Sequence, residues 1–142
     1  MADLSITASE VVQSTSSNDI SHGTSGQAVA IGDSVYKKAA DGKIWNADAD
    51  AAASAAAVGI AISTASAADQ GISYQFSGTL TVGATASVTA GATYWVSTNV
   101  GKIAVEGDLT TGDYVTYLGT ANASDQIVMP SGGPVASGVA HA

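Results

Sequence analysis

The sequence contains no cysteine, no arginine and only two prolines among its 142 residues. Because cysteine is absent, the chain can form neither disulfide bonds nor thiolate metal sites in any compartment. Four lysines oppose 12 acidic residues, which leaves a net charge of −8. Proteins that bind nucleic acids neutralise phosphates with Lys and Arg, usually in a basic patch. Nucleic acid is therefore not an expected partner.

Long hydrophobic runs are also absent. No apolar run approaches the roughly 20 residues that a membrane-spanning helix needs. Residues 1–30 contain neither the basic segment nor the apolar segment of a signal peptide. We therefore expect a soluble protein that is made in a cytoplasm and has no membrane partner.

The residue patterns that carry catalysis are missing as well. His22 and His141 have no neighbouring carboxylate or nucleophile, and no serine lies in a Gly-x-Ser-x-Gly motif. Asp48 and Asp50 have the spacing of a calcium loop, but the Gly and Glu that complete such a loop are absent. We interpret these two acids as residues at the start of a helix. We expect no enzyme activity, no cofactor and no metal site.

β-Forming segments, separated by Gly, Asn and Asp-Gly turns, begin at Gln27 and continue through most of the chain. The pattern predicts strands over residues 27–31, 33–38, 43–46, 58–63, 72–77, 79–82, 92–97, 102–105, 113–118 and 126–129. Between two of them, eight of the eleven residues of Ala47–Ala57 are alanine, which predicts a short helix of two to three turns. The expected fold is all-β: a small antiparallel β-barrel or sandwich built from hairpins, with one short Ala-rich helix.

The sequence divides into an extended N-terminal arm, residues 1–26, and a β domain, residues 27–142. Residues 13–26 are almost entirely small and polar and cannot offset their ordering entropy alone. The arm is therefore either a disordered terminus or a segment that orders on a neighbouring subunit by adding a strand to an exposed sheet edge. Its candidate contact residues are the apolar ones before the polar tract: Leu4, Ile6, Val11 and Val12.

A weak internal repeat appears at an offset of 59 residues. Five residues of the first segment recur in the second: Gly32, Tyr36, Gly42, Lys43 and Ile44 match Gly91, Trp95, Gly101, Lys102 and Ile103. Two interpretations stay open. The match reflects either two hairpins with the same turn chemistry or a duplicated β unit.

All eight aromatic residues fall between Tyr36 and Tyr117, and several have large apolar neighbours in sequence. Neighbouring residues of a strand point to opposite faces of a sheet, so both faces need a cover. That cover is either a second sheet of the same fold or another protein surface. The aromatic residues that we expect to be core or subunit-interface anchors are Tyr36, Trp45, Trp95 and Tyr114.

Several turn-and-strand motifs resemble the small decoration proteins of tailed-bacteriophage heads, also called capsid cement or head fibre proteins. The motifs are Gly26-Gln27-Ala28-Val29, Gly32-Asp33-Ser34-Val35-Tyr36, Asp41-Gly42-Lys43, Ala47-Asp48-Ala49, Val58-Gly59-Ile60-Ala61, Gly91-x-x-Tyr94-Trp95-Val96-Ser97, Gly101-Lys102-Ile103 and Thr111-Gly112-Asp113-Tyr114-Val115. The similarity covers about residues 26–129 and leaves out the serine-rich leader and the Gly-Pro tail.

The resemblance implies a viral structural protein on the outer capsid surface of the virion. Such proteins bind the major capsid protein of an assembled shell as symmetric oligomers, so we expect a homotrimer, with a homodimer as the alternative. The apolar residues of the arm would then dock on the capsid or on a neighbouring copy. A second interpretation is a β module that binds glycans or a host surface, with Tyr and Trp as stacking platforms.

Overall fold

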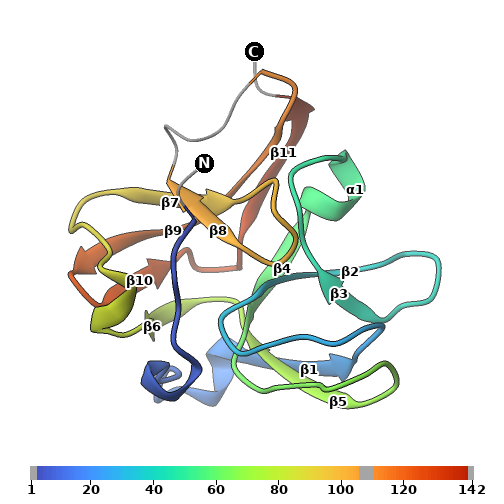
Figure 1. Ribbon diagram of the computed structural model, residues 1–142, viewed down its shortest axis with the longest axis horizontal. Helices are drawn as coiled ribbons and strands as arrows, with labels where there is room; N and C mark the ends of the chain where they lie inside the picture. Colours follow the sequence, from blue (N-terminus) through green and yellow to red (C-terminus); the bar gives the residue numbers. More distant parts are fainter. Residues whose placement is uncertain (1–2, 106–110, 141–142) are drawn as a thin grey trace.

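The computed structural model describes residues 3–105 and 111–140, which form two antiparallel β-sheets and one short helix (Figure 1). The expected all-β class is confirmed. In the described residues neither sheet closes on itself, so the fold is a β-sandwich and the barrel alternative is wrong. Residues of both sheets contribute to one large core cluster.

The five-stranded sheet has the order β1-β5-β4-β2-β3. Its strands are β1 (Ile20–Thr24), β2 (Ser34–Lys37), β3 (Ile44–Asn46), β4 (Ala57–Ala61) and β5 (Gly71–Gln75). The second sheet has the order β6-β10-β9-β7-β8, and β11 pairs with the first half of the long strand β9. Its strands are β6 (Gly78–Thr81), β7 (Thr93–Val96), β8 (Ile103–Val105), β9 (Tyr114–Ala123), β10 (Gln126–Met129) and β11 (Val135–Ala140).

The alanine-rich segment forms a much shorter helix than its composition predicts. Helix α1 covers only Ala52–Ala55, and Ala57 already belongs to β4. The flanking backbone is engaged elsewhere, because the Ala49 N–H donates to Ser97 O and Ala57 pairs with Tyr36. Pairing with the sheets therefore overrides the helix propensity of alanine.

The two sheets repeat one five-stranded unit. The strand orders correspond one to one, and the ladder pair Val35–Asn46 recurs 59 residues later as Tyr94–Val105. Each unit also has a bulge at the same point, after Val35 in one ladder and after Tyr94 in the other. Shared turn chemistry sets neither strand order nor bulge position, so these matches favour a duplicated β unit. We refer to β1–β5 as the N-terminal unit and to β6–β10 as the C-terminal unit.

Strand prediction failed at the two ends of the sequence. The strand expected over residues 27–31 is wrong, because this segment makes only an isolated bridge between Val29 and Ala65. Strand β1 instead lies at residues 20–24, within the segment assigned to the arm, and pairs along its length with β5. Strand β11 was not expected at all. Both missed strands are rich in Ser, Thr, Gly or Ala. Each is ordered by pairing with a neighbouring strand, β1 with β5 and β11 with β9.

The N-terminal segment before β1 runs along the protein's own domain (Figure 1). Asp3 bridges to Ala104 of β8, and Val12 bridges to Thr81 of β6, so this segment meets both edge strands of the C-terminal unit. We call residues 3–19 the strap. Pairing with edge strands protects them from pairing with other chains, and here the arm adds to its own sheet.

Candidate functional site

The six-stranded sheet turns one face away from the core, and cross-strand pairing arranges its side chains in two rows. The first row is Thr79, Val128, Thr120 and Thr93; the second is Val135, Tyr117 and Trp95. Neighbours of these residues along the strands, such as Tyr94 and Val96, are buried in the core. We call the seven residues of the two rows the outer face.

The second row of the outer face contains an aromatic pair, Trp95 and Tyr117. The rings of Trp95 and Tyr117 meet edge to face, with centroids 5.5 Å apart. The Trp95 Nε1–H donates to Thr93 Oγ1 at 3.0 Å, and the Tyr117 hydroxyl is hydrogen-bonded to Thr120 Oγ1. Their polar atoms are thus paired within the face, and the rings present mainly apolar surface.

The outer face also has exposed apolar side chains and no charge. Val128 is 37% exposed and Val135 is 59% exposed. None of the six strands contains Asp, Glu, Lys, Arg or His in its sequence, although 11% of the chain is charged. Depletion of charge together with aromatic residues is typical of the core of a protein–protein interface.

The four aromatic residues predicted as anchors lie in different places. Trp95 is part of the outer face, whereas Tyr36 is half-buried and packs against the large core cluster. Burial, followed by the nearby charges of Asp48 and Asp41, raises the pKa of the Tyr36 hydroxyl. Tyr114 is half-buried at the start of β9, where its N–H donates to Ala49 O.

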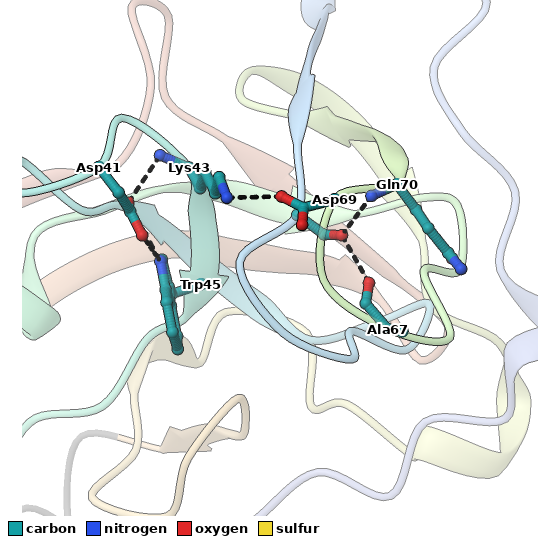
Figure 2. A network of polar contacts seen from close by, with 7 residues as sticks. Asp41, Lys43, Trp45, Ala67, Asp69 and Gln70 are labelled. Carbon is teal, nitrogen blue, oxygen red and sulfur yellow. Dashed lines mark hydrogen bonds and ion pairs between the residues drawn. The ribbon is translucent and has the colours of Figure 1, made fainter.

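Trp45, the fourth predicted anchor, belongs to a polar network within the N-terminal unit (Figure 2). Its Nε1–H donates to the Asp41 carboxylate at 3.2 Å, and Lys38 Nζ lies 4.3 Å from the ring centroid. The Gly26 backbone lies so close to the indole that a Cβ there would meet Nε1 at 2.2 Å. Contacts within the protein therefore cover the ring, which does not favour Trp45 as a stacking platform for a glycan.

The same network joins the β2–β3 hairpin to the loop before β5 (Figure 2). Lys43 Nζ forms an ion pair with Asp69 at 2.5 Å, and this hydrogen bond, with the Asp69 charge, raises the pKa of Lys43. The Lys43 N–H donates to Asp41 and is the main reason why the pKa of that carboxyl is lowered. Beside this pair, Ser25 Oγ donates to Ala67 O. These contacts hold the β2–β3 hairpin against the loop before β5, which is a structural role.

The predicted contact residues of the arm do not form one exposed patch. Leu4, Ile6 and Val11 are partly buried against the large core cluster, whereas Val12 is 59% exposed. Beside Val12 lies a groove of about 490 Å³. It is lined mostly by hydroxyl and amide side chains: Gln13, Ser14, Thr15, Ser16, Asp19, Thr79, Thr81 and Gln126.

Reactive chemistry is not apparent in the part of the chain that the structure describes. There, no three His, Cys, Asp or Glu side chains gather in a way that could hold a metal ion. His22 Nδ1 is 2.8 Å from Ser73 Oγ, and His141 lies outside the described residues. Within residues 3–105 and 111–140, no helix is long and apolar enough to cross a membrane.

Sequence reasoning singled out Trp95 but missed the rest of the outer face. Tyr117, Val128 and Val135 become neighbours only through the register of β9 with β7, β10 and β11. The one signal in the sequence that could have pointed to this face is the absence of charged residues from positions 78–101, 114–124 and 126–140.

No family model matches this chain, and no curated protein or solved structure matches it significantly.

Proposed function

We propose that this chain is a capsid decoration protein that binds the outer surface of an assembled phage shell and stabilises it. The observation that carries the proposal is the outer face, an uncharged surface with an aromatic pair and exposed valines on a chain of net charge −8. A surface of this kind works by adhesion to protein. The turn-and-strand motifs that resemble phage decoration proteins point to the same class.

Stabilisation of the shell would follow from mass action. A protein that binds only the intact lattice lowers the free energy of that lattice by RT ln(1 + [L]/Kd), or about 4 kcal/mol at a thousandfold excess over Kd. No catalysis and no cofactor are needed. The protein would be made in the host cytoplasm and reside on the virion surface, with the major capsid protein and further copies of itself as partners.

Val12 is the residue of the arm that we propose to contact the capsid. Its backbone is fixed to β6, since its N–H donates to Thr81 O at 2.9 Å and its carbonyl accepts from Thr81 N–H at 3.0 Å. Its exposed side chain lies beside a groove that is lined mainly by hydroxyl and amide groups and contains one carboxylate, Asp19. A partner there would meet an ordered apolar side chain at little conformational cost.

The test is co-sedimentation of the purified protein with shells of the phage that carries this chain, before and after heating. We expect binding and greater heat resistance of the shell. Val12→Glu should reduce shell occupancy, while Val100→Glu, at a valine that is 54% exposed in the β7–β8 turn, should not. Failure of the unmodified protein to sediment with any shell would overturn the proposal, and binding to sugar arrays instead would support a glycan-binding module.

A further inference from the structure

A hollow of about 320 Å³ on the N-terminal unit shares the strap residue Gln13 with the groove beside Val12. We call this hollow the first pocket and the groove beside Val12 the second pocket. The first pocket is lined by side chains from four parts of the chain: Gln13 of the strap, Ile20 and His22 of β1, Ile62 and Ser63 after β4, and Ser73 of β5.

The two pockets occupy equivalent positions of the repeated unit. The ladder pair His22–Ser73 lines the first pocket, and the corresponding pair Thr81–Gln126 lines the second. The correspondence follows from the strand pairing and agrees with the 59-residue offset of the ladder pairs in β2–β3 and β7–β8. Because Gln13 lines both pockets, they form one groove that crosses the two units at the strap.

The first pocket offers groups that can both donate and accept hydrogen bonds. His22 Nδ1 is 2.8 Å from Ser73 Oγ, a contact that uses only one of the two ring nitrogens. Ser63 Oγ accepts the Ser73 N–H at 2.8 Å and keeps its own O–H as a donor. Gln13 adds a carboxamide, which carries two donors and an acceptor. The pocket therefore suits a ligand with several hydroxyl groups.

The second pocket adds little charge to the groove. Asp19 is the one acid among its lining residues, and its carboxylate already accepts hydrogen bonds from Ser14 Oγ at 2.6 Å and Ser77 Oγ at 2.7 Å. The described residues that line the two pockets include no lysine, so an anionic ligand would meet no counter-charge there. Burying an unpaired charge is costly, and a neutral ligand is therefore favoured.

The strap is held in place between the pockets before a ligand binds. The Ser14 N–H donates to Oε1 of the buried Gln75 at 2.8 Å, and Val12 pairs with Thr81 of β6. The edge of β6 is thus occupied at Thr81, and an extended peptide cannot add a strand there. A ligand of the groove would meet side chains that are already positioned, which lowers the cost of binding.

We infer that the groove formed by the two pockets binds a neutral oligosaccharide. Sugar hydroxyl groups both donate and accept hydrogen bonds, and the C–H groups of a sugar ring would lie against Ile20, Ile62 and Val12. Two equivalent pockets suit a ligand of repeating units, because occupation of one pocket raises the effective concentration of the next unit at the other. No aromatic ring is among the described residues that line the groove, so this site does not use the stacking expected of Tyr and Trp.

The inference does not rest on shell binding. It adds a saccharide ligand to the proposed function, and it is measured on the purified protein without shells. Its failure and the failure of the proposed function are therefore separate results. The test variants leave Val12 unchanged for the same reason.

The test is an NMR titration of the isotope-labelled full chain with neutral oligosaccharides of glucose, galactose and N-acetylglucosamine, each from a single unit up to a hexamer. We expect at least one series to bind and to shift the amide signals of Gln13, His22 and Gln126. The affinity should rise by about tenfold or more from the single unit to the hexamer. A Gly-Ser peptide of similar length is the competing probe.

His22→Ala and Gln126→Ala, one in each pocket, should each weaken hexamer binding by about five- to tenfold, because each removes a hydrogen-bonding group. The matched control is Thr24→Ala, at an exposed side chain two residues along β1 from His22 and outside both pockets. This control should bind like the original protein. Thermal unfolding checks that each variant retains the fold.

The inference would be overturned if none of the three sugar series bound at about 10 mM. It would also be overturned if the Gly-Ser peptide bound as tightly as the hexamers, or if the hexamer bound no better than the single unit. Unchanged affinity in both His22→Ala and Gln126→Ala would place the bound sugar outside the groove.

Discussion

Gly59 and Gly119 occupy the same position in the two units, and each leaves room for the backbone of the strand opposite. A Cβ on Gly59 would lie 2.4 Å from Gln75 O, and a Cβ on Gly119 would lie 2.6 Å from Val128 O. Neither residue has a positive φ, so glycine is required here by the close approach of two strands. The paired bulges of the two units fall at these ladder positions.

Gly59→Ala and Gly119→Ala should therefore each destabilise the fold by about 1–3 kcal/mol, because the opposing strand has to move. Chemical denaturation measures the effect. Gly71→Ala is the control, since nothing lies within 4 Å of a Cβ at that position. Equal stability of all three variants would contradict the close approach.

Protonation of Glu10 at acid pH should weaken the attachment of the strap to the rest of the domain. Its carboxylate accepts hydrogen bonds from Thr85 Oγ1 at 2.7 Å and Thr85 N at 3.0 Å, and these bonds lower its pKa below the ordinary value of 4.5. A lowered pKa means that the stabilisation is present above about pH 4.5 and is lost as the pH falls through the folded value. We expect a smaller protection factor for the Val12 amide below that value, measured by hydrogen exchange and NMR.

Glu10→Gln separates this effect from the other acid that fastens the strap, Asp19, whose pKa is lowered by hydrogen bonds from Ser14 and Ser77. The variant should lose the part of the pH response due to Glu10 and keep the part due to Asp19. An unchanged pH profile would show that Glu10 does not hold the strap.

The charged carboxylate of Asp33 should lower the free energy of unfolding at neutral pH. Burial raises its pKa above the ordinary value of 3.8, against the hydrogen bond from the Ala30 N–H and the charge of Lys102. Because the folded protein holds this proton more tightly than the unfolded chain, the stability contributed by Asp33 falls as the pH rises through the folded pKa.

Asp33→Asn keeps an oxygen that can accept the Ala30 N–H and removes the charge. We expect the variant to gain stability relative to the original protein at pH 7, and the difference to shrink toward pH 4. Denaturant unfolding at several pH values measures it, with Asp125→Asn as a control for the general loss of negative charge. A constant difference across this range would refute the assignment.

Trp45 should matter for stability through its packing on Gly26 and its contact with Lys38. Trp45→Ala removes a half-buried indole and should destabilise the fold by about 1–2 kcal/mol. Lys38→Met keeps the aliphatic stem and removes the cation over the ring, so it should cost only about 0.5 kcal/mol. Thermal unfolding measures the stability of both variants. If Trp45→Ala left the stability unchanged, the contacts of the indole with Gly26 and Lys38 would not contribute to it.

Local sequence patterns predicted the central hairpins well. The expected strands over 33–38 and 43–46, and over 92–97 and 102–105, each contain an observed strand, because β-forming residues and Gly turns act within a few residues. The same rules failed at β1, whose sequence Ile-Ser-His-Gly-Thr has little strand propensity. Its order depends on β5, which lies about 50 residues further along the chain, as the pair Ser21–Tyr74 shows.

The sequence by itself determined the all-β class, the turn positions, the shortage of charge and the 59-residue echo, since these depend on composition and on neighbours along the chain. Only the tertiary structure decided that the arm fastens to its own sheet, that Trp45 is covered, and that Trp95, Tyr117 and Val135 form one row. Strand register and burial are set by contacts between residues far apart in sequence. A one-residue shift of register moves a side chain to the opposite face of the sheet.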